Sequence, residues 1–126
     1  MSETGKRTEQ TLLNHLQAFG RGDVDAIMDD YAEDAVYITP EGTLRGRGEI
    51  RSLFESLVAD LPPGSAFAVS QQLIEGEMAY IVWSGESGKL KIPFATDTLI
   101  VRDGKIVAQT FAAQMEEKAF QGIPRI

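Results

Sequence analysis

One carboxylate of this chain stands in a stretch that the sequence predicts to be a buried strand. Asp97 lies in the middle of F-A-T-D-T-L-I-V and shares a strand face with Leu99 and Val101. Burial among apolar side chains disfavours the charged form of a carboxyl group and so raises its pKa. A protonated acid in a dry pocket can donate a hydrogen bond to a developing oxyanion. The alternative is a carboxylate that reaches solvent at a pocket rim or is held by Thr96 or Thr98.

The only histidine, His15, is the second residue that could do acid–base chemistry. It borders a helical stripe of apolar residues formed by Leu12, Leu16 and Phe19. An imidazole near neutral pH can donate a hydrogen bond or act as a general base. The alternative is a histidine at the edge of the core with a backbone partner and no chemical role. A lone histidine without any cysteine does not supply a zinc site, so we expect no metal and no cofactor.

Aromatic side chains supply the apolar surface that a ligand pocket needs. Most of them are expected in the core, but Tyr31 and Trp83 each pair a polar tip with an apolar body, which suits the half-hydrated mouth of a pocket. Phe54 faces inward from a predicted helix. We therefore expect Tyr31, Phe54 and Trp83 to bind the ligand, with His15 and Asp97 beside them.

Composition and charge exclude several classes of function. The formal net charge of −7 argues against binding to a phosphate backbone, so we expect no nucleic-acid partner. No stretch reaches a membrane-spanning length and the N-terminus has no apolar signal core, so we expect no membrane partner and a single cytoplasmic domain over residues 1–126. The acidic run between Asp23 and Asp34 is expected to be a solvated surface, with a divalent metal site as the alternative.

The first half of the chain has mainly helical periodicity. Its pattern predicts three helices: Thr8–Gly20, a second capped by Asp23 with Tyr31 on its apolar face, and Glu49–Ala59. Between the second and third helices, Ala35–Thr39 is short, partly β-branched and ended by a proline, so it predicts a strand.

The second half changes to the two-residue period of strands. Four strands are expected, at Ala66–Ile74, Met78–Gly85, Leu90–Val101 and Lys105–Met115. Helices followed by a run of hairpins predict an α+β fold, with the helices packed on one face of an antiparallel sheet. The strands are apolar on both faces. Because three helices can cover only one face, we expect the other to bind a second copy of the chain in a homodimer.

Several segments carry a resemblance to a known family. They are G-D-V-D-A-I after the first predicted helix, Y-A-E-D-A-V-Y at the first strand, L-R-G-R-G-E-I-R-S-L-F at the third helix, and the closing V-R-D-G-K-I-V hairpin. From about Thr8 to Met115 the chain resembles the nuclear-transport-factor-2-like superfamily, in its SnoaL-like and ketosteroid-isomerase-like branch. The resemblance implies a cone-shaped fold: a curved, mainly antiparallel sheet wrapped round three N-terminal helices, with a pocket at the open end and commonly a dimer through the sheet.

The resemblance also bears on the candidate residues. Aligned on the closing hairpin, Asp97 falls where ketosteroid isomerases place a hydrogen-bond-donating acid, and His15 falls where they carry an oxyanion-binding tyrosine. Thr39, just before Pro40, falls near their general-base carboxylate. A threonine cannot abstract a proton unaided at neutral pH, which argues against steroid-type isomerisation by that mechanism. We assign Thr39 to ligand contact instead.

Two functions of different classes follow from these residues. The fold that the resemblance implies hosts isomerases, dehydratases, cyclases, hydrolases and non-enzymatic binding domains. A threonine in place of the base at position 39 favours a SnoaL-like domain that binds a small apolar molecule with no defined activity. A histidine facing an aspartate favours a cofactor-independent acid–base enzyme of isomerase, dehydratase or cyclase type, acting on a small apolar carbonyl or hydroxy compound. We expect the binding domain and keep the enzyme as the alternative.

Overall fold

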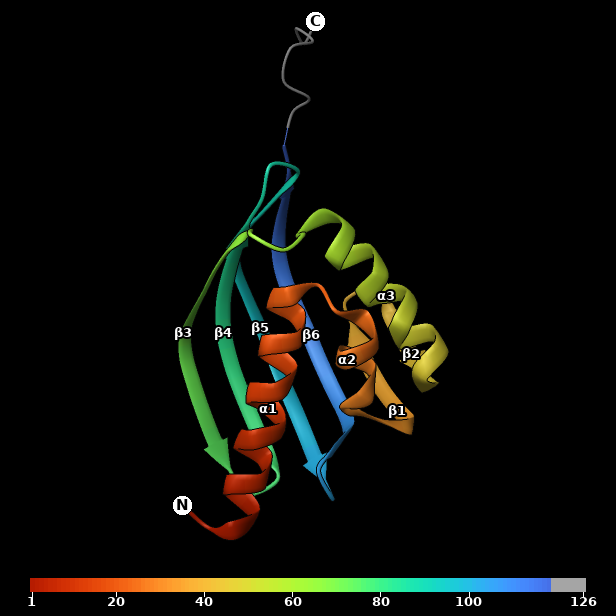
Figure 1. Cartoon of the computed structure of the whole chain (residues 1–126), viewed down its shortest axis with the longest axis vertical. Helices are drawn as coiled ribbons and strands as arrows, with labels where there is room; N and C mark the ends of the chain where they lie inside the picture. The colour runs from red at the N-terminus through yellow and green to blue at the C-terminus, as the bar shows by residue number, and fades with distance from the viewer. Residues whose placement is uncertain (119–126) are drawn as a thin grey trace, which may run out of the picture.

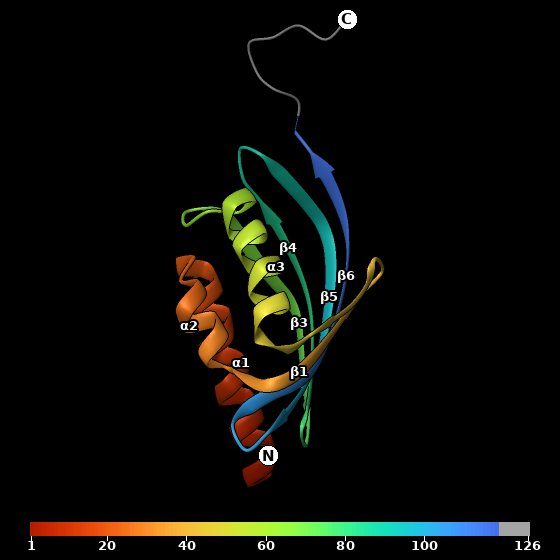
Figure 2. The same ribbon diagram turned by 90° about the vertical axis from the view of Figure 1, so that its right-hand side faces the viewer.

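The computed structural model describes residues 1–118. Three helices and six strands follow in the order α1 (Glu3–Arg21), α2 (Val24–Asp29), β1 (Tyr31–Thr39), β2 (Gly42–Arg45), α3 (Gly46–Asp60), β3 (Ala66–Glu75), β4 (Met78–Glu86), β5 (Leu90–Arg102) and β6 (Lys105–Glu117). The strands form one open sheet in the order β2-β1-β6-β5-β4-β3. All three helices lie on the same side of this sheet, which bends around them (Figure 1 and Figure 2).

Helix α1 is fixed at both ends by its own sequence. Ser2 caps the N-terminus, because its hydroxyl accepts a hydrogen bond from the backbone N–H of Gly5. At the C-terminus, Gly22 adopts a left-handed conformation with φ of 67°, and its N–H donates to the carbonyl of Phe19. A Cβ on Gly22 would also approach Pro63 to 2.9 Å, so this turn requires glycine. The serine cap explains why the helix starts at Glu3, five residues before the predicted Thr8.

The region around Tyr31 departs most from the sequence prediction. Helix α2 ends at Asp29, so Tyr31 begins strand β1 and does not lie on a helix face, and the strand starts four residues before the predicted Ala35. Strand β2, which the sequence did not predict, pairs with β1 through a hairpin in which Thr39 lies opposite Gly42. Strand β1 also pairs in parallel with β6, and the other strand pairs within residues 1–118 are antiparallel.

The four hairpin strands are confirmed, each to within two residues of its predicted end. The turn between β5 and β6 shows why the sequence predicts such turns. Asp103 and Gly104 both adopt positive φ, 53° and 76°, as the turn type matched to the strand twist demands. The α+β class and the packing of three helices on one sheet face are likewise confirmed.

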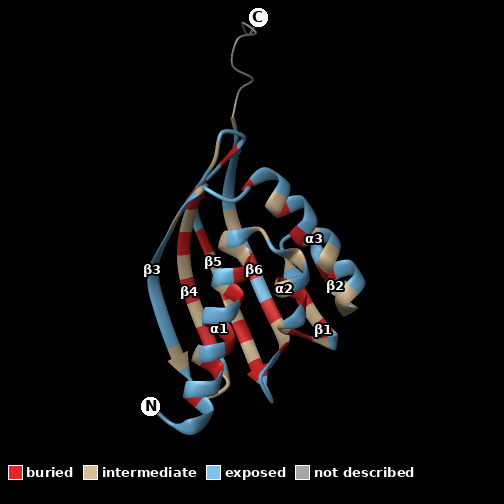
Figure 3. Ribbon diagram, in the orientation of Figure 1, coloured by how far each residue is buried: buried red, intermediate tan, exposed pale blue. Residues whose placement is uncertain are grey.

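Alternation along the strands separates two faces of the sheet (Figure 3). Residues paired directly across antiparallel strands share a face, so Ile81, Asp97 and Phe111 point together toward the helices. We call this the inner face, and the core lies between it and the helices. The outer face exposes large apolar side chains, among them Ile38 (48%), Leu73 (59%), Met78 (46%) and Phe94 (50%).

Candidate functional site

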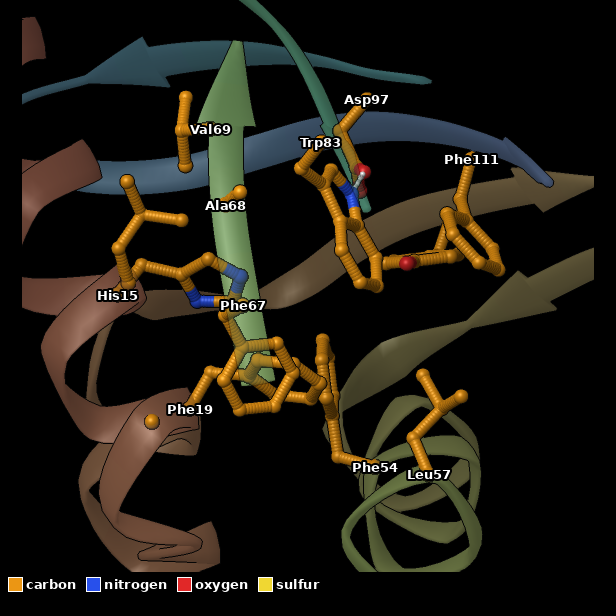
Figure 4. Close-up of a pocket in the computed structure, with 13 residues that line it drawn as sticks. His15, Phe19, Phe54, Leu57, Phe67, Ala68, Val69, Trp83, Asp97 and Phe111 are labelled. Atoms are coloured by element: carbon orange, nitrogen blue, oxygen red, sulfur yellow. Dashed lines mark hydrogen bonds between the residues drawn. The ribbon is translucent and has the colours of Figure 1, made fainter. Parts of the chain in front are cut away.

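A cavity of about 150 Å³ lies between α1, α3 and the inner face of β3, β4, β5 and β6 (Figure 4). Most of its wall is apolar, and its ionisable members are His15, Asp97 and Tyr37. The lining residues are His15, Leu16, Phe19, Gly20, Tyr37, Phe54, Leu57, Phe67, Ala68, Val69, Trp83, Asp97 and Phe111.

The strand register places Asp97 and Trp83 side by side. Asp97 pairs with Ile81 on β4, and Trp83 lies two residues further along β4, so both side chains point to the inner face. The indole of Trp83 stacks on the ring of Phe111, with centroids 6.3 Å apart and planes inclined by 18°. Gly85 makes room for this wall, since a Cβ there would lie only 3.1 Å from Trp83 Cζ3 and 3.3 Å from Phe67 Cδ1.

A buried hydrogen-bond network holds the Asp97 carboxylate at both oxygens. Trp83 Nε1 donates to Asp97 Oδ1 at 2.7 Å, and Gln109 Nε2 donates to Asp97 Oδ2 at 2.7 Å. Gln109 is itself oriented by the Tyr31 hydroxyl, which donates to Gln109 Oε1 at 2.5 Å. Tyr31, Gln109 and Trp83 therefore each donate one hydrogen bond to a protein acceptor, and Asp97 is the acceptor in both of its bonds.

Burial raises the pKa of Asp97 to about 6, while the hydrogen bonds from Trp83 and Gln109 pull it down. The side chain is only 6% exposed. No Lys or Arg lines the cavity among the residues that the structure describes, so no cation offsets the carboxylate there. At neutral pH the site therefore contains a largely ionised carboxylate that is hydrogen-bonded but has no counter-charge.

His15 lines the same cavity from α1, one turn after Leu12 and on the same buried side of the helix. Burial lowers the pKa of its imidazole to about 4, so the ring is neutral near pH 7. The ring meets Tyr31 and Phe54 edge to face, with centroids 5.7 Å and 5.5 Å away. Within residues 1–118, the enclosed Nδ1 has no hydrogen-bond partner.

His15 and Asp97 thus share one cavity, and no hydrogen bond joins them within residues 1–118. Figure 4 shows the histidine ring on the helix side and the carboxylate on the sheet side next to Trp83. Both hydrogen bonds of Asp97 recorded within residues 1–118 come from Trp83 and Gln109, and none comes from His15. Nor do Thr96 or Thr98 hold the carboxylate, because alternation turns them to the outer face.

The other predicted ligand contacts divide into two groups. Phe54 and Trp83 line the cavity as expected, but Tyr31 does not. Tyr31 lies behind the wall, 2% exposed, with its hydroxyl committed to Gln109. Thr39 lines a second, wider cavity of about 610 Å³ between α3, the β1–β2 hairpin and the end of β6.

This outer groove differs from the inner cavity in charge. It is lined by four exposed carboxylates, Glu41, Glu49, Asp60 and Glu117, above an apolar floor. Leu57 and Phe111 line both cavities, so these two side chains form the partition between them.

Gln109 is the site residue that sequence reasoning missed. A glutamine in a strand usually indicates a solvent-facing position, yet Gln109 is 2% exposed. Gln109 pairs with Leu99, which lies two residues from Asp97 on the same strand face. This pairing was the signal that could have placed Gln109 near Asp97. Pairing β5 with β6 through the Asp103–Gly104 turn brings the amide beside the carboxylate.

Two acids of the acidic run near α2 make local contacts. Asp23 caps α2 by accepting a hydrogen bond from the N–H of Ala26, and Asp25 pairs with Arg51 on α3. Within residues 1–118, no group of three or more His, Asp or Glu side chains is arranged to hold a metal ion. None of the helices in this part of the chain is long and apolar enough to cross a membrane.

Solved structures share this arrangement. A nuclear-transport-factor-2-like protein of unknown function from Burkholderia xenovorans LB400 aligns with a TM-score of 0.75 and 23% identity over 99% of both chains. A protein from Kribbella flavida DSM 17836, provisionally described as a ketosteroid isomerase, aligns with a TM-score of 0.73 and 17% identity over 96% of this chain and 85% of that one. A de novo designed protein with a curved β-sheet aligns with a TM-score of 0.75 and 15% identity over 90% of this chain and 88% of the design.

These similarities define a nuclear-transport-factor-2-like fold. The sequence matches the SnoaL-like domain family over residues 12–109, and the chain belongs to that family. None of the curated proteins matches the chain.

Proposed function

We propose that this SnoaL-like domain binds a small, mostly apolar molecule in the inner cavity. The observation that carries the proposal is an apolar cavity with one buried polar cluster at its sheet side, formed by Asp97 and its partners. Sites for small molecules combine these two properties, since apolar walls supply affinity and a few placed polar groups fix orientation. In this proposal the sheet and helices form the cone that the family resemblance implies, and the cavity is its binding pocket.

The size of the cavity limits the ligand to about one ring. An apolar cavity of about 150 Å³ accommodates a molecule such as benzene. A steroid is several times larger and would need Leu57 and Phe111 to move so that the inner cavity joins the outer groove. We therefore propose a monocyclic ligand for the site in its present form.

The alternative is a cofactor-independent acid–base enzyme, and one observation favours it. The His15 imidazole, neutral near pH 7, faces the same cavity as a carboxyl group whose pKa is raised to about 6, so the cavity holds a neutral base and an acid that titrates near neutral pH. An oxyanion hole, however, needs donors aimed at the substrate, and the hydrogen bonds that Tyr31, Gln109 and Trp83 donate go to protein acceptors. Binding without oxyanion chemistry is the function that we place first. The cytoplasmic location expected from the sequence stays a prediction.

Trp83 gives a direct test, because it is the only tryptophan and lies in the cavity wall. Titration with toluene should shift its emission in a saturable way and raise the melting temperature, since a ligand that binds only the folded state stabilises it. The variant Val69→Phe should weaken toluene binding by about tenfold, because a phenyl ring at this lining position occupies ligand space.

The matched control is Leu73→Phe on the outer face of the same strand. It should leave toluene binding unchanged. An emission spectrum that does not respond to toluene or to other monocyclic probes, such as benzyl alcohol and benzylamine, at millimolar concentrations would contradict the proposal.

A further inference from the structure

The Asp97 carboxylate is the feature that the proposed function leaves unexplained. Buried charges in proteins are usually paired with an opposite charge, because removing an ion from water is costly. Asp97 is 6% exposed, and its partners Trp83 and Gln109 are neutral donors. The other ionisable side chains that line the cavity are His15, a neutral imidazole, and Tyr37, a phenol whose pKa burial raises, so neither brings a positive charge. The site therefore contains a negative charge that the described protein residues do not balance.

The hydrogen-bond donors and acceptors around Asp97 also indicate that a cationic donor is missing. A carboxylate has about four lone-pair positions, and Trp83 and Gln109 occupy one on each oxygen. Asp97 can accept more hydrogen bonds but cannot donate one while ionised. The Tyr31 O–H, the Trp83 N–H and one N–H of Gln109 are already donated to protein acceptors, so these three hydrogens are not free for a ligand that only accepts hydrogen bonds.

We propose that the inner cavity selects a monocyclic amine, bound as its ammonium ion with the charge against Asp97 and the ring against Trp83, Phe54 and Phe111. This inference rests on the proposed function and adds the chemical class of its ligand. The ammonium group supplies both things that the site lacks, namely a positive charge and hydrogen-bond donors for the open positions on the carboxylate. Aromatic faces near the cation strengthen the attraction.

Ligands of other classes satisfy the site less well. An alcohol brings one donor and no charge. A carbonyl compound brings only an acceptor, which cannot satisfy the open positions on Asp97. A carboxylic acid brings a like charge into a site without a cation. The order of preference is therefore amine, alcohol, then hydrocarbon and aldehyde, with the carboxylate last.

A series of ligands with one ring and one variable group tests this order on the unmodified protein. Benzylamine, benzyl alcohol, benzaldehyde, toluene and benzoate would each be titrated by calorimetry and by Trp83 emission at about pH 7.5. We expect benzylamine to bind about tenfold or more tightly than toluene and benzaldehyde, with benzyl alcohol between them and benzoate unbound.

The outcomes separate the two proposals. If toluene or benzaldehyde binds as tightly as benzylamine, the amine inference is overturned while the binding function stands. If none of the five compounds binds, both are overturned. The series needs no substitution, so it decides the question even if a variant fails to fold.

The variant Asp97→Asn then identifies the source of the selectivity. An asparagine can keep the network, because its amide can donate to Gln109 Oε1 once the Gln109 amide rotates toward Tyr31. The benzylamine preference over toluene should fall to about threefold or less, with the affinity for toluene unchanged. The control Asp34→Asn removes the same charge at an exposed position outside the cavity and should leave the preference intact. An undiminished preference in a folded Asp97→Asn protein would overturn the assignment to Asp97.

Discussion

The inner face of the sheet holds Asp97 and Gln109 beneath the helices, whereas the outer face exposes Ile38, Leu73 and Phe94 to solvent. An antiparallel sheet with one solvated face normally has the opposite distribution, with polar residues outside. On the inner face, the two polar groups are joined by a hydrogen bond, and Asp97 lines a cavity. On the outer face, the apolar groups have no covering element within residues 1–118.

The buried polar residues and the exposed apolar residues are both exceptions to the usual pattern, and the stability of the fold alone does not explain why they are there. A sequence optimised only for stability would put apolar side chains where Asp97 and Gln109 lie, and polar ones where Leu73 and Phe94 lie. A de novo designed protein has a similar fold with a curved β-sheet. We therefore attribute the buried polar residues to ligand binding and the exposed apolar ones to the predicted homodimer.

The largest expected effect comes from breaking the inner network at Gln109. Replacing Gln109 by Leu leaves Asp97 Oδ2 and the Tyr31 hydroxyl without their partner. The free energy of unfolding should fall by about 3 kcal/mol or more, since each unsatisfied buried group costs about 1–3 kcal/mol and a charged one more. The control Gln114→Leu, on the outer face of the same strand, should change it by less than about 0.5 kcal/mol. Urea unfolding of both variants measures the difference, and equal losses would remove the distinction between the two faces.

The pH dependence of stability isolates the charge of Asp97. Its pKa is about 6 in the folded state against an ordinary value of 3.8, so the folded state binds the proton more tightly. The stability that this group contributes is present at low pH and is lost as the pH rises from about 4 through 6. Asp97→Asn lacks this loss, so its stability relative to the unmodified protein should increase by up to about 3 kcal/mol between pH 4 and pH 7.

Comparison of the two proteins is needed because other groups titrate in the same range. His15 has a lowered pKa of about 4, so its contribution to the free energy of unfolding is lost as the pH falls from 6.5. This is opposite in direction to the effect of Asp97. Asp30, behind Tyr31, has a raised pKa of about 6 and acts in the same direction as Asp97. Urea unfolding at several pH values gives the difference curve, and a flat curve would show that Asp97 is solvated.

A smaller effect is expected on the outer face. The predicted homodimer should give twice the chain mass of 13.8 kDa in light scattering at micromolar concentration. Leu73→Lys should weaken it by about tenfold or more, because two copies of the charge enter one symmetric interface. Leu13→Lys makes the same change at an exposed position on α1, away from this face, and should leave the dimer intact. A monomeric unmodified protein would mean that a second copy does not cover the outer face.

Much of the fold could be predicted because it depends on local signals. Turn residues such as Asp103 and Gly104 delimit the hairpin strands, and the helical period of apolar residues finds α1 and α3. Tyr31 was misplaced because the apolar spacing of α2 continues past its end, while the parallel pairing with β6 that turns Tyr31 into a strand residue is a contact between distant segments. Strand β2 was not predicted because four residues are too few to show a period.

The site was partly predictable for the same reason. Strand alternation was sufficient to place Asp97 inward, and the helical stripe placed His15 at the buried side of α1. The role of Asp97 was not predictable, because it depends on Gln109 and Trp83 arriving from two neighbouring strands. The single-residue pattern suggested a free acid that donates a hydrogen bond, and the three-strand register makes it an acceptor.

The most direct test of this account is an NMR titration of the Asp97 carboxyl group with and without benzylamine. The groups that titrate around it, His15 on α1, Tyr31 and Tyr37 on β1 and the adjacent Asp30, would be followed in the same spectra. The account predicts a pKa of about 6 in the free protein. Saturating benzylamine should lower it by about one unit or more, because a bound cation favours the ionised form. A pKa near the ordinary 3.8 that benzylamine leaves unchanged would contradict it.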